Sequence, residues 1–183
     1  MTATVAETAS PGQGFLLDAW QGLLAEAQAR PDPLERGRTI LRAFAADPAR
    51  VAGLPLARTA GGYARNFLFG DATMSVWAIA WAPGAATSIH DHHCSCCFAV
   101  LAGDLTERWF EAVGEGTGEA HRARLTRETV RRPGFSACML PTGPNIHQML
   151  NAGEDEAVSL HVYGFDPAVR ASSVEREYAL AAH

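Results

Sequence analysis

Beyond Tyr63 the sequence changes to short apolar segments with turn residues between them. In the first segment, YARNFLF at 63–69, the large side chains Tyr63, Arg65, Phe67 and Phe69 alternate with Ala64, Asn66 and Leu68. Similar short segments follow at 74–82, 97–110, 135–140 and 157–164. A period of two is the geometry of a β-strand, and turn signals this frequent favour an antiparallel sandwich or barrel. The sequence therefore predicts a mainly β fold, with a small antiparallel β-barrel over residues 63–183.

The first third of the chain has helical spacing instead. Residues 14–30 place four apolar side chains three or four positions apart, namely Leu16, Trp20, Leu23 and Ala27. A second helix is predicted to begin at Asp32, which is a good N-cap residue, with Pro33 in the first turn and Glu35 as the partner of a capping box. Asp47 and Pro48 end it.

A length of 183 residues, 48% of them hydrophobic, fits one structural domain with a sizeable core. We expect a flexible tail at 1–13, a helical N-terminal cap at 14–62 and the barrel at 63–183. The net charge of −5 includes no basic block, which argues against nucleic acid or an acidic membrane as a partner. No apolar run approaches the about 18 residues of a membrane span, and residues 1–14 lack the features of a secretion signal, so a cytoplasmic location is expected.

Four cysteines stand at Cys94, Cys96, Cys97 and Cys138. In a reducing cytosol, cysteines are more often thiols or metal ligands than structural disulfides. The first three are also too close in sequence to close a loop among themselves. We therefore expect thiols, with Cys94 and Cys138 as small buried or partly buried ones.

His90 and His92 are two residues apart, which on a strand places both imidazoles on one face. His147 follows a turn signal and is the best candidate for a third metal ligand. Three neutral histidines leave coordination positions open, as catalytic metal sites do. A structural zinc site is less favoured, because zinc knuckles need a second, distant cysteine pair and only Cys138 remains elsewhere.

The spacing of these residues resembles the cupin superfamily. Its first motif is matched by Gly84, His90, His92, Cys96 and Gly103, with Cys96 where the motif has glutamate. Its second is matched by Pro141, Gly143, His147 and Asn151, with a departure of one residue. A cupin with cysteine at that position resembles the cysteine dioxygenase family, the thiol dioxygenases. SIHDH at 88–92, YARN at 63–66 and SLHVY at 159–163 are similar to further segments of that family, so the resemblance covers about 63–164.

The resemblance implies a cupin fold and one Fe²⁺ per chain held by His90, His92 and His147. It implies O2 as co-substrate and a small thiol that is oxidised to a sulfinic acid. Ser159, His161 and Tyr163 correspond to a proton and hydrogen-bond relay. Their alternation with apolar residues independently places the three on one strand face.

The resemblance leaves the substrate open. Arg65, next to Tyr63 in the substrate-binding segment, corresponds to a clamp for the substrate carboxylate and points to L-cysteine. Arg170 could hold a carboxylate from another side, as an arginine does in relatives that act on 3-mercaptopropionate. Another small thiol, or a non-enzymatic metal-binding cupin that senses oxidants, are the other interpretations. The sequence does not indicate an oligomeric state.

Some members of the family have a thioether between a cysteine and the relay tyrosine, here Tyr163. Counting back from Gly103 selects Cys96, whereas counting forward from His92 selects Cys97. We favour Cys96, because the register of a side chain is fixed by its own strand rather than by the preceding turn.

Overall fold

Two β-sheets face each other in this protein, and a helix packs on the outside of the first sheet, with part of the core on each side of that sheet. The computed structural model describes residues 6–7, 22–23, 25–46, 54–114 and 121–181. The first sheet has the order β1 (Ala6–Glu7), β2 (Tyr63–Gly70), β3 (Ser75–Trp81), β10 (Ala157–Tyr163), β5 (Cys96–Ala102) and β8 (Ser136–Met139). The second closes on itself in the order β11 (Val174–Leu180), β4 (Ile89–His92), β9 (His147–Leu150), β6 (Leu105–Val113) and β7 (Arg122–Arg131).

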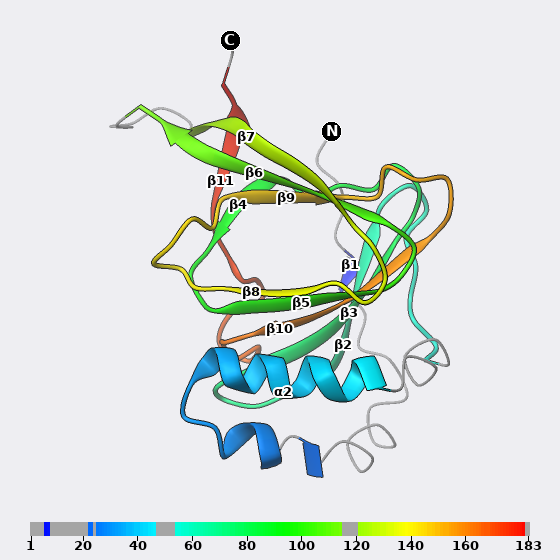
Figure 1. Ribbon diagram of the computed structural model, residues 1–183, viewed down its shortest axis with the longest axis vertical. Helices are drawn as coiled ribbons and strands as arrows, with labels where there is room; N and C mark the ends of the chain where they lie inside the picture. The colour runs from blue at the N-terminus through cyan, green and yellow to red at the C-terminus, as the bar shows by residue number, and fades with distance from the viewer. Residues whose placement is uncertain (1–5, 8–21, 24, 47–53, 115–120, 182–183) are drawn as a thin grey trace.

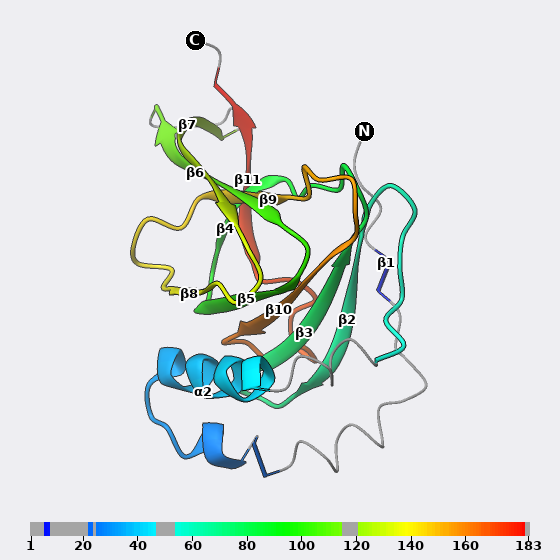
Figure 2. The same cartoon turned by 45° about the vertical axis from the view of Figure 1, so that its right-hand side comes forward.

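The strand pairings are antiparallel except for two parallel ones, β1 with β2 and β7 with β11. Figures 1 and 2 show β6, β9 and β4 on one side of the molecule and β5, β10, β3 and β2 on the other. The mainly β, cupin-type barrel predicted from the sequence is therefore confirmed.

The helix α2 (Pro33–Ala46) lies along the outer face of the first sheet (Figures 1 and 2). The backbone N–H of Leu34 donates to Asp32 Oδ1 over 2.9 Å, which confirms Asp32 as the N-cap. Glu35 pairs with Arg38 instead of closing a capping box. The opposite face of α2 buries Ile40, Leu41 and Phe44 against the sheet.

The two faces of β10 show how alternation sorts side chains in this fold. Leu160 and Val162 pack outward into the cluster beneath α2. Ser159, His161 and Tyr163 are buried on the other face, toward the second sheet. The one-face arrangement predicted for these three residues is confirmed.

Glycine is required at two close approaches. A Cβ on Gly37 would lie 2.8 Å from Cys97 Cβ, so glycine lets α2 come down onto β5. Gly103, at the β5–β6 turn, has φ of 64°, and a Cβ there would meet the backbone of Glu156 at 2.6 Å.

Several elements differ from the prediction. Within the tail expected at 1–13, Ala6–Glu7 pairs with Ala64 and Arg65 of β2. The segment 157–164 was expected to be the last strand, but β11 follows it, and β7 was not predicted. Both of these strands are largely exposed, so they lack the apolar signal that marks a strand in sequence.

Part of the predicted first helix lies outside the described residues, including Leu16 and Trp20, as do Asp47 and Pro48. Ala27, which is described, is buried in the same cluster as α2. In the described part of the chain, no helix has the length and apolar character to cross a membrane.

Candidate active site

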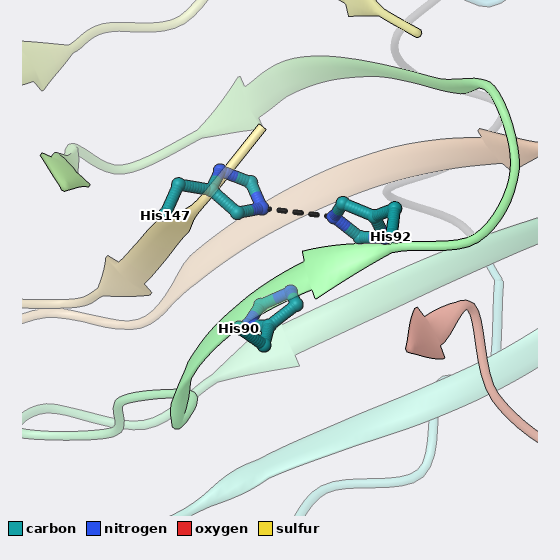
Figure 3. Close-up of side chains that lie close together, drawn as sticks. All are labelled: His90, His92 and His147. Atoms are coloured by element: carbon teal, nitrogen blue, oxygen red, sulfur yellow. Dashed lines mark hydrogen bonds between the residues drawn. The ribbon is translucent and has the colours of Figure 1, made fainter. Parts of the chain in front are cut away.

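The three histidines predicted to bind metal meet on the inner face of the second sheet. His90 and His92 lie on β4, and the pairing of β4 with β9 places His147 directly opposite His90. All three are buried, and their ligand atoms lie within 4.8 Å of one another. Figure 3 shows the imidazoles of the two strands turned toward a common point.

Hydrogen bonds at Nδ1 orient two of these histidines, His90 and His147. His90 Nδ1–H donates to the backbone oxygen of Ser88 over 2.9 Å, and His147 Nδ1 lies 3.4 Å from Glu107 Oε1. Each bond fixes the proton on Nδ1 and the lone pair on Nε2. The second shell therefore orients His90 and His147 as metal ligands.

The electrostatics of the group also fit a cation. Burial, and then the neighbouring His147, lower the pKa of His90 to about 3, and burial lowers the pKa of His92 as well. The rings of His90 and His92 are therefore neutral at physiological pH. His92 Nε2 and His147 Nε2 face each other at 3.0 Å. A separation this short would let both nitrogens contact one ion.

Glu107 on β6 supports the site and is not among the residues predicted from the sequence. Burial opposes its ionisation, but the bonds to His147 and Arg131 outweigh it and lower the pKa of this carboxyl. It is fully buried. Glu107 comes two residues after Leu105, and alternate residues of a strand share a face. The sequence could therefore have indicated that Glu107 faces inward with Leu105, which is also fully buried.

Ser159, His161 and Tyr163 form a hydrogen-bonded chain. Trp81 Nε1–H can only donate, and it donates to Ser159 Oγ over 2.8 Å. Ser159 Oγ lies 2.8 Å from His161 Nε2, and His161 Nδ1 lies 3.2 Å from Tyr163 Oη. No other acceptor for the Ser159 hydroxyl is found among the described residues, so this hydroxyl donates to His161 Nε2.

This direction fixes the position of each proton in the hydrogen-bonded series from Ser159 to Tyr163. Burial is the main cause that lowers the pKa of His161 to about 3, so the ring is neutral and carries its proton on Nδ1. Nδ1–H then donates to the oxygen of Tyr163. Burial raises the pKa of Tyr163, so the phenol keeps its proton. That proton is left for an acceptor other than His161.

The cysteines beside Tyr163 are divided between the two faces of β5. The register of β5 and β10 sets Cys96 opposite Tyr163, and both belong to one buried cluster. Cys97 lies on the other face, beneath α2. Of the two candidates for a thioether, the structure therefore brings Cys96 alone to the side of Tyr163.

The prediction that Cys97 and Cys138 are thiols is wrong. They form a disulfide between β5 and β8, where the strand pairing sets them directly opposite each other. Proximity along the sequence could not indicate this pair, because the two residues are 41 positions apart. Cys94 and Cys96 are buried free thiols, as expected for Cys94.

A cavity of about 320 Å³ opens between the sheets at this site. Tyr63, Arg65, His90 and Tyr163 all line it, so residues from three separate sequence segments meet there. The guanidinium of Arg65 lies 4.3 Å from the centre of the Trp77 ring, and its Nη1 donates to the Ala171 oxygen over 3.0 Å. Its Nη2 is buried and has no hydrogen-bond partner among the described residues.

The other arginine considered for the substrate carboxylate lies elsewhere. Arg170 is exposed and pairs with Glu175 over 3.2 Å. It does not line the cavity that Arg65 lines. The structure therefore brings Arg65, but not Arg170, to the histidine group.

Comparison with known families agrees with this geometry. The family model for cysteine dioxygenase type I matches residues 34–172. The chain belongs to the cysteine dioxygenase type I family. Membership supports a dioxygenase-type oxidoreductase as the class of enzyme, and the three histidines give this member of the family a group that could hold a metal ion.

Solved structures similar to this cysteine dioxygenase family member include two proteins of the cupin superfamily and one with a double-stranded β-helix domain. A conserved protein with a double-stranded β-helix domain from Klebsiella pneumoniae is 18% identical, with a TM-score of 0.46 and coverage of 60% of this chain and 82% of that one. A sugar phosphate isomerase of the cupin superfamily from Silicibacter pomeroyi is 22% identical, with a TM-score of 0.42 and coverage of 54% of each chain. A cupin superfamily protein from Desulfitobacterium hafniense is 12% identical, with a TM-score of 0.42 and coverage of 57% and 78%.

Proposed function

We propose that this chain is a thiol dioxygenase that uses one Fe²⁺ per chain and adds both atoms of O2 to the sulfur of a small thiol. The O–O bond breaks, two S–O bonds form, and the thiol becomes a sulfinic acid. L-cysteine, giving cysteine sulfinate, is the proposed substrate, with 3-mercaptopropionate or another small thiol as alternatives. A small-molecule thiol is the only partner in this proposal, which involves neither nucleic acid nor a membrane.

One observation carries the proposal: the cavity lined by Arg65, which has a free donor, and by the protonated Tyr163 is also lined by His90, one of the three histidines that could hold a metal ion. A metal-binding module that only senses oxidants needs neither the arginine nor the tyrosine. A thiol with a carboxylate needs both a metal that lowers the pKa of the sulfur and a clamp for the acid group.

The histidines His90, His92 and His147 would hold the ion and leave coordination positions open toward the cavity. When bound, Fe²⁺ would supply the one-electron chemistry that O2 requires and a position for the thiol sulfur. Neutral imidazoles suit this ion, and family membership supports the choice of iron.

Arg65 is proposed to hold the substrate carboxylate through its free Nη2. Trp77 and the Ala171 oxygen already fix the guanidinium plane, so little side-chain entropy is lost when the substrate binds. Tyr63, whose ring lies against that of Trp81, would line the same pocket.

Tyr163 is proposed to donate its proton as a hydrogen bond to the reacting oxygen. His161 and Ser159 would hold the phenol so that its proton points away from His161. The bond from Trp81 to Ser159 sets the donor direction along these hydrogen bonds. Cys96 is the proposed partner of Tyr163 in a thioether, because the two face each other across β5 and β10.

The experiment is oxygen consumption by protein loaded anaerobically with Fe²⁺ and then given O2 and one of four thiols: L-cysteine, 3-mercaptopropionate, cysteamine or mercaptosuccinate. The proposal expects one sulfinate formed for each O2 consumed, fastest with L-cysteine. His147→Ala is the control and should lose both iron and turnover. If the wild type retains iron but forms sulfinate from none of the four thiols, the result would favour a cupin that only senses oxidants.

A further inference from the structure

A second cavity lies on the outside of the first sheet, between α2 and the strands β5 and β8. Its volume is about 530 Å³, and Leu41, Ala99 and Leu101 give it an apolar wall. None of the residues that line it also lines the cavity of the histidine group. This outer cavity is therefore separate from the site to which the dioxygenase function is assigned.

The outer cavity has a positive charge. Arg38 and Arg42 of α2 both line it, and no acidic residue does. Arg38 pairs with Glu35 over 3.0 Å. Arg42 is exposed and has no ion pair among the described residues. A guanidinium without a partner, next to an apolar wall, suits a small organic molecule that has a carboxylate.

The disulfide brings a reactive group to the same cavity. Cys138 lines it and is half-buried, whereas Cys97 is only 1% exposed. Cys97 lies beneath α2, where a Cβ on Gly37 would come within 2.8 Å of Cys97 Cβ. Thiol–disulfide exchange requires that a thiolate reach one of the two sulfurs. A thiol in the outer cavity therefore meets Cys138, and Cys97 is the leaving group.

We propose that Cys138 is a thiolation site for a small thiol that has a carboxylate. The thiolate attacks Cys138 Sγ, the S–S bond to Cys97 breaks, and a new S–S bond joins Cys138 to the incoming sulfur. Cys97 leaves with the electron pair and gains a proton, which balances the proton that the incoming thiol loses. Arg42, with Arg38 beside it, holds the carboxylate of the incoming thiol.

The product of this exchange fits the surroundings of both cysteines. The new substituent on Cys138 occupies the outer cavity. The Cys97 thiol stays in the buried apolar cluster beneath α2, where a cysteine behaves as a small apolar side chain. The exchange needs neither Fe²⁺ nor O2, so the thiolation site is independent of the proposed dioxygenase function.

Peptide mapping identifies the sulfur that is attacked. The protein is incubated anaerobically with mercaptosuccinate, which has two carboxylates, or with 2-mercaptoethanol, which has none. Samples taken at early times are denatured in N-ethylmaleimide, digested and analysed by mass spectrometry. We expect the mass of mercaptosuccinate on Cys138 and that of N-ethylmaleimide on Cys97. The opposite arrangement, or no mixed disulfide with either thiol, overturns the proposal.

Arg42→Gln tests the recognition of the carboxylate. The matched control is Arg36→Gln, because Arg36 lies on the same helix and does not line the outer cavity. In Arg42→Gln we expect the second-order rate constant of thiolation by mercaptosuccinate to fall about 2- to 5-fold, the range for an exposed ion pair, and that for 2-mercaptoethanol to stay unchanged. Arg36→Gln should react with both thiols as the wild type does. An equal fall for the two thiols, or equal effects of the two variants, refutes the role of Arg42.

Discussion

Removal of the Cys97–Cys138 disulfide should destabilise the protein by an amount that follows from where the two residues lie. The bond joins β5 to β8, the edge strand of the first sheet, across 41 residues of sequence. The chain-entropy model for a closed loop of that length gives about 4 kcal/mol at 25 °C, and measured values usually fall at or below such an estimate. We therefore expect a loss of about 2–4 kcal/mol in the free energy of unfolding.

Cys138→Ser is the substitution that tests this most cleanly. Cys138 is only half-buried, so a serine hydroxyl there can reach water, whereas Cys97 is fully buried beneath α2. The Cys97 thiol that remains behaves as a small apolar side chain in its cluster. The measured loss then reports the covalent link rather than a buried unsatisfied hydroxyl.

The assay is urea unfolding of wild type and variant, each with and without a phosphine reductant. We expect the reduced wild type to match Cys138→Ser, and reductant to leave that variant unchanged. Cys94→Ala is the control: Cys94 is a buried free thiol, so this variant should still lose stability on reduction. The reasoning would be contradicted if reductant left the urea unfolding curve of the wild type unchanged. Mass spectrometry must show in that experiment that the reductant has opened the disulfide.

Four further predictions concern the site and its surroundings. Tyr163→Phe should lower kcat by a factor of about 10–1,000 while iron content, measured by metal analysis, is unchanged. Arg65→Ala should cost about 2–5 kcal/mol in kcat/KM for L-cysteine and for 3-mercaptopropionate but far less for cysteamine, and equal losses for all three would make Arg65 a structural residue. Glu107→Gln should weaken metal binding about 10- to 100-fold in a titration with Co²⁺, because it removes the charged partner of His147. Burial opposes ionisation of Asp71, but the hydrogen bonds that it accepts from Gln28, Thr73 and Met74 lower its pKa. Its contribution to stability is therefore complete above the usual pKa range of aspartate and is lost as the pH falls below that range, and Asp71→Asn should flatten that acid-side loss in urea midpoints.

Local patterns in the sequence predicted the parts of the site that depend on one strand or one turn. His90 and His92 share a face because they are two apart on β4, and the same period places Ser159, His161 and Tyr163 on one face of β10. Asp32 and Pro33 begin α2 through interactions within one helical turn. Each of these features is encoded within a few residues.

Features that depend on pairing between distant strands could not be predicted in this way. The disulfide of Cys97 with Cys138 exists because β5 lies beside β8, and β11 lines the cavity of the histidine group because it lies beside β4. β11 and β7 bury few side chains, so their sequences carry little of the apolar alternation that reveals a strand. In the sequence, Arg170 remains a second candidate for the substrate carboxylate beside Arg65, and only the fold separates them.

The central claim is that this cavity adds both atoms of one O2 molecule to a thiol, and isotope labelling tests it most directly. Iron-loaded protein is given L-cysteine and ¹⁸O2 in unlabelled water, and the sulfinate is analysed by mass spectrometry. The account predicts a product in which both sulfinate oxygens carry the label. Sulfinate with one labelled oxygen, oxygen derived from water, or cystine as the only product would contradict it.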